Sequence, residues 1–549
     1  MGNDVATDET FPKLSPEALA RLRSYGVREQ TEVGQHLYSV TDSDYEMIVV
    51  ESGSIDLYRA GNSAAPLRLI AHLCPGDFLG EVSLLTHQRM FLKAAVSEAG
   101  AVHRLSRAAF ERMMASDTEL NEIVLTALVG RRENLLTSAA SSIVIVGNDR
   151  SRESLALREF VSRFDIPNLW AEPDSELGLR EAAEHGLSEA DLPFAIVPDE
   201  VLPRATPGSL SDALGISFRA DPDRDVDLVI VGGGPAGLAA SVYGASEGLQ
   251  TVLLDSLLPG GQAGSSSRIE NYLGFPHGLA GAQLTRLATL QALKFGAQLY
   301  APCRVSDVAR SGDGILVTLA DGQVIRSRAA IIATGAEYRR LPLDGWDDFE
   351  GASILFAATE VEARAYAGQP VAIVGGGNSA GQAALFLASR GSAVDLIVRA
   401  DDLAKGMSAY LVRRVLDHPG IEVHTSAEVT ELTGAGDCLS EITVSCGASA
   451  SRLSCAALFC FIGATPASEW LPGVATDENG FVLTDSRIPA FSIDSEWPAI
   501  GRLPLPFETS IPGIFAVGDV RAGSMKRRVG RRRGRERGRI RQRHARLMR

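Results

Sequence analysis

Two glycine-rich loops in the second half of the chain have the residue types and spacing that hold the phosphates of a dinucleotide. The first, residues 232–237 (GGGPAG), follows an apolar strand and opens a helix of small residues. Its first glycine allows a tight turn, its second lets the backbone approach a pyrophosphate, and its third allows close helix–strand packing. The next apolar run ends in Asp255, where a carboxylate can accept hydrogen bonds from ribose hydroxyls. This context predicts a dinucleotide site.

The second loop, residues 375–380 (GGGNSA), repeats the arrangement after another apolar strand. Its following strand, residues 393–398, ends in Arg399 rather than in an acid. A carboxylate there would repel a 2′-phosphate, whereas a guanidinium can pair with it. The opposite charges at the two strand ends predict two different nucleotides, one a flavin nucleotide and the other NADPH.

The elements that must position these loops alternate regularly. After a polar linker at 221–225, apolar strands and Ala-rich helices alternate to about residue 520, which is typical of doubly wound α/β domains. Residues 12–110 read as short strands of a small β-barrel, and a helical stretch follows over 106–136. Residues 141–217 alternate strand and helix again. At 549 residues the chain is too long for one core, so a multidomain protein is expected.

The chain from about 225 to 527 resembles the low-molecular-weight thioredoxin reductases. Residues 259–262 (PGGQ), with the segment 269–275 after them, resemble the flavin-cradling segment of that family. Residues 333–335 (ATG) resemble its crossover motif between two domains, and 513–519 (GIFAVGD) its second FAD motif. Two Rossmann-like three-layer domains are therefore expected.

In that family the FAD domain is discontinuous, because the NAD(P)H domain is inserted after the crossover motif. The resemblance thus implies an FAD domain at 225–341 and 466–527 and an NAD(P)H domain at 342–465. The loops and the resemblance together predict FAD contacts at Gly232, Gly234, Pro235, Ala236, Gly237, Asp255, Gly261, Gln262, Asn271, Thr334, Gly335, Gly518 and Asp519. They predict NADPH contacts at Gly375, Gly377, Asn378, Ser379, Ala380 and Arg399.

One departure from the family bears on activity. Family members carry a redox Cys-x-x-Cys pair upstream of the second glycine loop, but residues 353–359 contain no cysteine. The six cysteines of the chain form no such pair and match no zinc-site spacing, so we expect reduced thiols and no metal. No catalytic dithiol is predicted.

We therefore expect hydride transfer from NADPH to FAD and onward transfer of electrons to an unidentified acceptor, such as a ferredoxin, a flavodoxin, a quinone or oxygen. The alternative is a sensor whose flavin state or N-terminal ligand controls partner binding with little turnover.

Two further domains precede the flavin region. Residues 75–85 (PGDFLGEVSLL) resemble the phosphate-binding cassette of cyclic-nucleotide-binding domains, which places such a module at 12–138 with Gly80 and Glu81 as candidate ligand contacts. That family also needs an Arg followed by small residues, but here Met90 and Phe91 follow Arg89. We expect a cyclic nucleotide to bind weakly or not at all.

Residues 141–217 resemble a thioredoxin- or glutaredoxin-like domain. Leu192 and Pro193 stand where those folds place a cis-proline before a strand. Ser151 and Ser154 occupy the positions of the two redox cysteines, and serine cannot cycle through a disulfide. A docking or spacing role is therefore expected.

The net charge of −15 is unevenly distributed. Residues 526–549 hold one Lys, twelve Arg and one Glu, a net charge of +12, so the preceding residues carry −27. The acidic body argues against nucleic-acid binding by the main domains. No apolar run approaches the ~18 residues that span a bilayer. We expect a cytoplasmic homodimer without a membrane partner.

The Arg-rich tail at 528–549 has too few apolar residues to form the small-residue helix that follows in the resembling family. Two explanations stay open. One is a basic arm for nucleic acid or acidic partners; the other, which we favour, is a shifted reading frame in a GC-rich gene.

Overall fold

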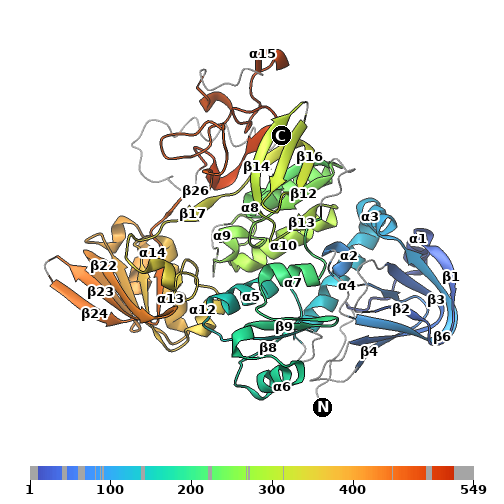
Figure 1. Ribbon diagram of the computed structural model, residues 1–549. Helices are drawn as coiled ribbons and strands as arrows, with labels where there is room; N and C mark the ends of the chain where they lie inside the picture. Colours follow the sequence, from blue (N-terminus) through green and yellow to red (C-terminus); the bar gives the residue numbers. More distant parts are fainter. Residues whose placement is uncertain are drawn as a thin grey trace.

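The computed structural model describes residues 10–524 apart from 40–45, 60–67, 81, 87, 89–91, 138–142, 220–225, 267–268, 270–271, 313, 448 and 490–496. The chain forms four units: a β-rich unit with helices, then a small α/β unit, and then two larger α/β units (Figure 1). The predicted multidomain fold class is confirmed. The Arg-rich tail and the candidate residues Glu81 and Asn271 lie outside the described residues.

The N-terminal unit is built on a six-stranded antiparallel sheet. Its order is β1-β6-β3-β4, with β2 beside β6 and β5 beside β3. The strands are β1 (Val27–Thr31), β2 (His36–Tyr38), β3 (Met47–Arg59), β4 (Arg68–Leu73), β5 (Phe78–Leu79) and β6 (Leu92–Leu105). Helices α1 (Pro16–Ser24), α2 (Ser83–Thr86), α3 (Arg107–Ser116) and α4 (Thr118–Thr137) accompany them.

The helical stretch expected over 106–136 is present as two helices, α3 and α4, that are separated at Asp117. Asp117, between α3 and α4, has extended backbone angles (φ −115°, ψ 98°). Its carboxylate accepts hydrogen bonds from the Leu120 amide at 3.1 Å and from Arg21 Nε at 2.8 Å. The bond to Leu120 caps the start of α4, which favours a new helix over continuation of α3.

The second unit has a four-stranded sheet of order β10-β9-β7-β8. Its elements are β7 (Val144–Val146), α5 (Arg152–Arg163), β8 (Leu169–Ala171), α6 (Glu176–His185), β9 (Phe194–Val197), β10 (Glu200–Leu202) and α7 (Pro207–Ala213). Strands β7 and β8 are parallel, while β9 runs antiparallel to β7. The Leu192–Pro193 bond is cis, as predicted. Ser151 caps α5 and donates to Ser154 Oγ at 2.8 Å.

The third unit holds the first glycine loop. Its seven-stranded sheet has the order β13-β12-β11-β16-β15-β14, with β27 beside β16. The strands are β11 (Val226–Val231), β12 (Thr251–Leu254), β13 (Gln298–Tyr300), β14 (Val305–Ser311), β15 (Gly314–Leu319), β16 (Val324–Ile332) and β27 (Ile514–Ala516). Helices α8 (Pro235–Ser246), α9 (Gly261–Gly264) and α10 (Gly281–Lys294) complete it, with short turns η3 (Asp485–Arg487), α15 (Trp497–Ile500) and η5 (Gly518–Val520) in its C-terminal part.

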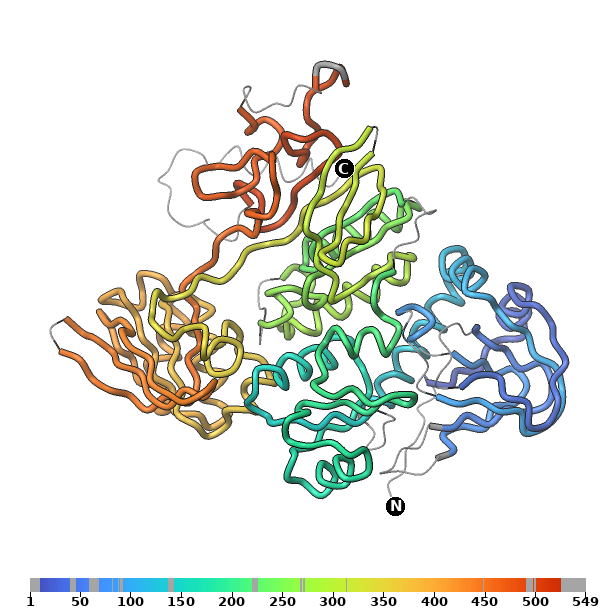
Figure 2. Tube along the Cα trace, in the orientation of Figure 1, coloured from blue at the N-terminus to red at the C-terminus, as the bar shows by residue number. Residues whose placement is uncertain are grey.

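The fourth unit interrupts the third. The chain leaves through β17 (Ala336–Tyr338) and returns through β26 (Ala464–Pro466), which pair antiparallel and run side by side between the two units (Figure 2). A five-stranded parallel sheet of order β18-β25-β19-β20-β21 forms its centre. Its strands are β18 (Ile354–Leu355), β19 (Pro370–Val374), β20 (Ala393–Val398), β21 (Ile421–Thr425) and β25 (Ala457–Cys460).

Helices α11 (Trp346–Phe349), α12 (Glu360–Ala365), α13 (Asn378–Ser389) and α14 (Ala409–Leu416) and the 3₁₀ turn η2 (Leu403–Lys405) belong to the same unit. A three-stranded antiparallel sheet, β22 (Ala427–Ala435), β23 (Cys438–Cys446) and β24 (Ser449–Ser454), lies beside its main sheet.

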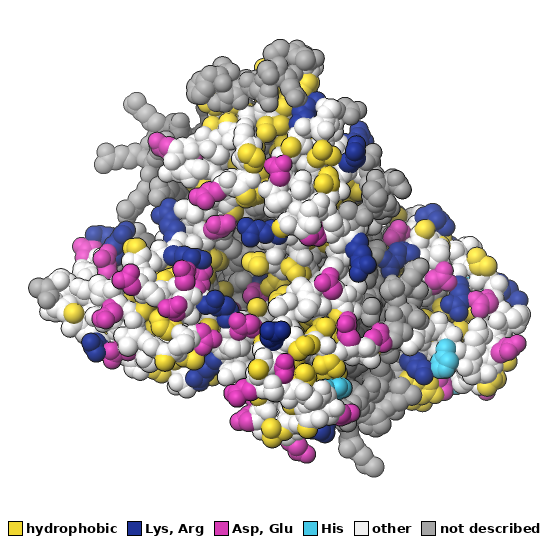
Figure 3. Space-filling model, viewed as in Figure 1, with side chains coloured by type: hydrophobic (Ala, Val, Ile, Leu, Met, Phe, Trp, Pro, Cys, Tyr) yellow, Lys and Arg dark blue, Asp and Glu magenta, His cyan; other side chains and the backbone are white. Residues whose placement is uncertain are grey.

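The N-terminal units are packed together rather than merely linked. One continuous cluster of buried apolar side chains includes Val82 of the first unit, Ile143 and Phe160 of the second, and Leu293 of α10. On the face drawn in Figure 3, acidic and basic side chains are interspersed over all units. Among the described residues, no helix is long and apolar enough to cross a membrane.

Candidate functional site

The first glycine loop leaves room at the start of a helix. Gly234 is the N-cap of α8, and Pro235 takes the first helical position. A Cβ added at Gly234 would meet nothing within 4 Å, whereas one at Gly237 would overlap the carbonyl oxygen of Gly232. The helix N-terminus therefore faces open space with unused amide donors, as anion binding requires.

Asp255 is part of the same loop. Its Oδ2 accepts from the Gly233 amide at 2.6 Å, and its Oδ1 accepts from the amides of Leu257 and Leu258 at 2.9 Å each. Burial raises the pKa of the Asp255 carboxyl, and the amides of these three residues oppose that rise. The predicted ribose acceptor thus also fixes the shape of the loop.

The other candidate FAD residues gather around the start of α8. The amide of Gly260 donates to Gly233 O at 2.8 Å, and a Cβ at Gly261 would lie 2.9 Å from Gly234 Cα. A Cβ at Gly518, which precedes the part-buried Asp519, would lie 2.8 Å from Ala236 Cβ. The parallel pairing of β11, β16 and β27 brings these distant segments together.

The side chains of two more candidates donate to backbone carbonyl oxygens. Gln262 Nε2 donates to the carbonyl oxygen of Ala336, and Thr334 Oγ1 donates to that of Ala467 at 2.7 Å. Gly335 follows with a positive φ of 73°. In this structure these side chains hold the crossover segment in place.

The second glycine loop has a similar start and a more open end. Gly377 caps α13, and a Cβ there would meet nothing within 4 Å. Asn378 Oδ1 accepts from the amide of Ser408 at 2.7 Å and from its hydroxyl at 3.0 Å. Ser379 is exposed and Ala380 is buried, while Arg399 is exposed at the end of β20.

No dithiol faces either loop. All six cysteines are free. Burial raises the pKa of Cys303 and of Cys455 to about 12 each and that of Cys460 to about 11, so these thiols stay protonated at neutral pH.

Sequence reasoning missed two groups. Arg163 of α5 reaches the end of α9, where its Nη2 donates to Ser265 Oγ at 2.9 Å. Asp395, Glu422 and His424 meet on neighbouring strands β20 and β21, and His424 Nε2 lies 2.7 Å from Asp395 Oδ1. Neither group forms a sequence motif, because its members come together only through packing.

The candidate cyclic-nucleotide site is tightly closed on one side. Gly80 is buried, and its carbonyl oxygen accepts from Arg131 Nη1 of α4 at 2.9 Å. A Cβ at Gly80 would lie 2.8 Å from Leu84 Cδ1 and 3.2 Å from Leu128 Cδ2.

Comparison with known proteins identifies two regions of the chain. The family model for pyridine nucleotide-disulphide oxidoreductases matches residues 226–544, and that for cyclic nucleotide-binding domains matches 28–117. The chain is 30% identical over 305 residues to a thioredoxin reductase of Treponema pallidum, covering 55% of this chain and 92% of that protein. It is 32% identical over 307 residues to a thioredoxin reductase of Yarrowia lipolytica, covering 54% and 89%. A solved T. acidophilum thioredoxin reductase is similar at 26% identity and TM-score 0.48, covering 56% and 93%.

Proposed function

Because this chain belongs to the pyridine nucleotide-disulphide oxidoreductase family, we propose that it is an FAD-dependent oxidoreductase that takes hydride from NADPH and delivers electrons to an acceptor other than an internal dithiol. The observation that carries the proposal is the pair of glycine loops, each of which leads into a helix whose N-terminus is open. The strand that follows the first loop ends in an acid, Asp255, and the strand that follows the second ends in a base, Arg399. When bound, the flavin supplies a two-electron store between donor and acceptor.

The first loop fits the FAD pyrophosphate and ribose. The open N-terminus of α8 offers amides to phosphate, and Asp255 offers carboxylate oxygens to a ribose. Gly261 and Gly518 let the backbone come close to this end of α8. We assign the FAD domain to 225–341 and 466–527.

The second loop fits NADPH. The N-terminus of α13 takes the pyrophosphate, and exposed Arg399 pairs with the 2′-phosphate. Asn378 acts by holding Ser408 beside the loop. We assign the NAD(P)H domain to 342–465.

The acceptor must take electrons from the flavin directly. Leu355 and Ala358, in the stretch where relatives of this type are expected to carry the redox pair, are buried and have no redox chemistry. The buried thiols of Cys303, Cys455 and Cys460 are protonated and spread over different elements. A small molecule or a redox protein fits this site, and a thioredoxin is a poor substrate.

Steady-state NADPH consumption by the flavin-loaded protein, measured with a quinone, ferredoxin, flavodoxin, oxygen and thioredoxin, tests the proposal. Turnover with at least one non-dithiol acceptor, and little with thioredoxin, is expected. Flavin reduction in a single turnover without consumption of NADPH with any acceptor would instead favour the sensor.

The N-terminal module is proposed to bind cyclic nucleotide weakly or not at all. The Gly80 carbonyl is already bonded to Arg131, and the side chains of Leu84 and Leu128 pack closely against Gly80. Calorimetry with cyclic AMP should show no micromolar binding. We also propose a cytoplasmic location, since six free thiols fit a reducing compartment. A homodimer is proposed as well, and light scattering tests it.

A further inference from the structure

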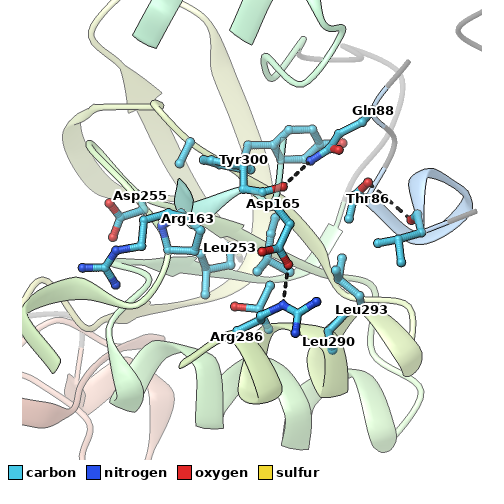
Figure 4. Close-up of a pocket in the computed structure, with 16 residues that line it drawn as sticks. Thr86, Gln88, Arg163, Asp165, Leu253, Asp255, Arg286, Leu290, Leu293 and Tyr300 are labelled. Atoms are coloured by element: carbon cyan, nitrogen blue, oxygen red, sulfur yellow. Dashed lines mark hydrogen bonds and ion pairs between the residues drawn. The ribbon is translucent and has the colours of Figure 1, made fainter. Parts of the chain in front are cut away.

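A cavity lies where three of the units meet, next to Asp255 at the end of β12 and to Pro259, which begins the flavin-cradling segment. It is lined by Thr86 and Gln88 of the first unit, Arg163 and Asp165 of the second, and Asp255 and Tyr300 of the third. In Figure 4, Arg163 and Asp255 lie on the same side of this cavity, and Arg286 points to Asp165. The thioredoxin-like unit therefore forms part of the wall of a cavity that also includes Asp255, a candidate FAD contact.

Arg163 packs its guanidinium against the flavin-cradling turn. A Cβ at Gly260 would lie 2.9 Å from Arg163 Nη1, and a Cβ at Gly264 would overlap the guanidinium. The same turn contacts the glycine loop, since the Gly260 amide donates to Gly233 O. Glycines at these two positions thus leave room for a cation one turn away from the phosphate-binding loop.

The bonding of Arg163 is incomplete. Its side chain is only 8% exposed, and Nη2 bonds Ser265 Oγ at 2.9 Å and Glu159 Oε1 at 3.2 Å. Nη1 is buried and has no hydrogen-bond partner among the described residues. Asp255 lies near enough for the charge of Arg163 to oppose the rise of its carboxyl pKa, but Nη1 forms no hydrogen bond to it. A buried cationic N–H without an acceptor is unfavourable unless an anion binds there.

The glycine loop lacks a cation of its own. Between Val226 and Ser267 the sequence contains no Lys or Arg. Phosphate charges at this loop would meet backbone amides and the dipole of α8, but no positively charged side chain from residues 226–267. Arg163 is a positively charged side chain of another unit that lies against the turn beside this loop.

We propose that Arg163 of the thioredoxin-like domain is the cationic partner of the FAD pyrophosphate. The inference rests on the proposed flavin function and deepens it. It gives this domain, which lacks redox cysteines, a binding role: its helix α5 carries a positioning residue into the site of a neighbouring domain.

The chain after Arg163 is anchored in a way that fixes its position. Gln88 Nε2 donates to the Phe164 carbonyl at 3.1 Å, and fully buried Arg132 donates to the Asp165 carbonyl at 2.8 Å. Arg286 Nε lies 2.5 Å from Asp165 Oδ2. Side chains from both neighbouring units therefore hold the end of α5, which fixes where the Arg163 guanidinium lies against the turn.

The test is equilibrium binding of FAD and of ADP to flavin-free full-length protein, for the unaltered chain and for Arg163→Gln, Arg163→Lys and Arg286→Gln. ADP carries the pyrophosphate without the flavin ring. Arg163→Gln should weaken the binding of both ligands roughly 10- to 100-fold, which is the usual effect of losing a charge-assisted hydrogen bond. Arg163→Lys should recover part of the loss.

Arg286→Gln is the matched control, because Arg286 docks the same domain but already pairs with Asp165 and Glu133. This variant should weaken FAD binding by less than about threefold. Equal loss in Arg286→Gln and Arg163→Gln would assign Arg163 to docking and overturn the inference, as would unchanged ADP binding in Arg163→Gln. Thermal unfolding without ligand shows whether each variant folds. If Arg163→Gln unfolds at a lower temperature and Arg163→Lys binds FAD no better than Arg163→Gln, the inference is also overturned. If the unaltered chain binds no FAD, the proposed function itself fails.

Discussion

The last glycine of the first loop is Gly237, and a methyl group there would overlap the carbonyl oxygen of Gly232. The second loop carries Ala380 at the same place, with its methyl group fully buried. The two loops share a motif, yet the first packs its helix closer to the strand. The tighter loop is also the one surrounded by other elements, since α9 and η5 contact it and Arg163 of α5 packs against α9 from the other side of that turn.

The residues at the two strand ends also differ in burial, and again the first site is the more enclosed. Asp255 is half-buried and organises three backbone amides, whereas Arg399 is exposed at its strand end. An enclosed site suits a group that stays bound, and an open site suits one that exchanges at each turnover. The comparison indicates that the same loop motif can hold a nucleotide that stays bound or one that exchanges, and that the surrounding elements decide which.

The largest effect is expected where the two loops differ by one methyl group. Gly237→Ala should weaken FAD binding roughly 10- to 100-fold, because overpacking a tight contact costs about 1–3 kcal/mol. Flavin content after purification and a FAD titration measure it. The matched change Ala380→Gly should leave FAD binding intact and cost about 1 kcal/mol of stability. Equal flavin content in both variants would remove the distinction between the loops.

The next effect concerns the support of the first site. Glu508 is fully buried, pairs with Arg502 at 2.6 Å and accepts from the Gly513 amide at 2.9 Å, just before β27. Glu508→Gln should lower the stability of the flavin domain by about 1–3 kcal/mol at pH 7. Chemical unfolding followed by flavin fluorescence measures it. Glu441→Gln in the partly exposed pair with Arg452 is the control and should change little.

The same carboxylate gives a pH dependence. Burial alone would raise the pKa of Glu508, but Arg502 and the amides of Gly513 and Leu505 outweigh burial and lower it. A lowered pKa means that the stabilisation is complete above the ordinary Glu pKa and is lost as pH falls through the folded-state value. Stability of the unaltered protein should therefore fall below about pH 4.5 more steeply than that of Glu508→Gln. Parallel curves would contradict this assignment.

A smaller effect is expected at the open site. Arg399→Ala should reduce the preference for NADPH over NADH in flavin reduction by about tenfold, since a charge-assisted bond to the 2′-phosphate is lost. Stopped-flow flavin reduction with both donors measures it, and Arg390→Ala, on the adjacent helix end and paired with Glu360, is the control. Equal rates with NADH and NADPH in the unaltered protein would refute the role of Arg399.

The last prediction is an absence of change. NADPH should reduce the flavin without creating new thiols, because the six cysteines are already free. Thiol titration under denaturing conditions before and after NADPH gives the count. Two additional thiols would reveal a redox pair and contradict the proposed direct route to the acceptor.

The sequence by itself determined both glycine loops, the opposite charges that follow them, the order of the domains and the missing redox pair. These depend on local chain geometry, since a glycine turn between an apolar strand and a helix needs only neighbouring residues to form. For the same reason the cis Leu192–Pro193 bond and the N-cap position of Ser151 could be expected from their segments.

Only the tertiary structure decided which side chains remain available to a ligand. Asn378 and Thr334, which the sequence predicts as nucleotide contacts, also bond Ser408 and Ala467, and only folding brings these partners near. Arg163 has no motif and belongs to another domain, yet packing inserts it beside Gly260 and Gly264. The physical reason is that burial and hydrogen-bond satisfaction are set by segments far apart in the chain, which a local pattern does not contain.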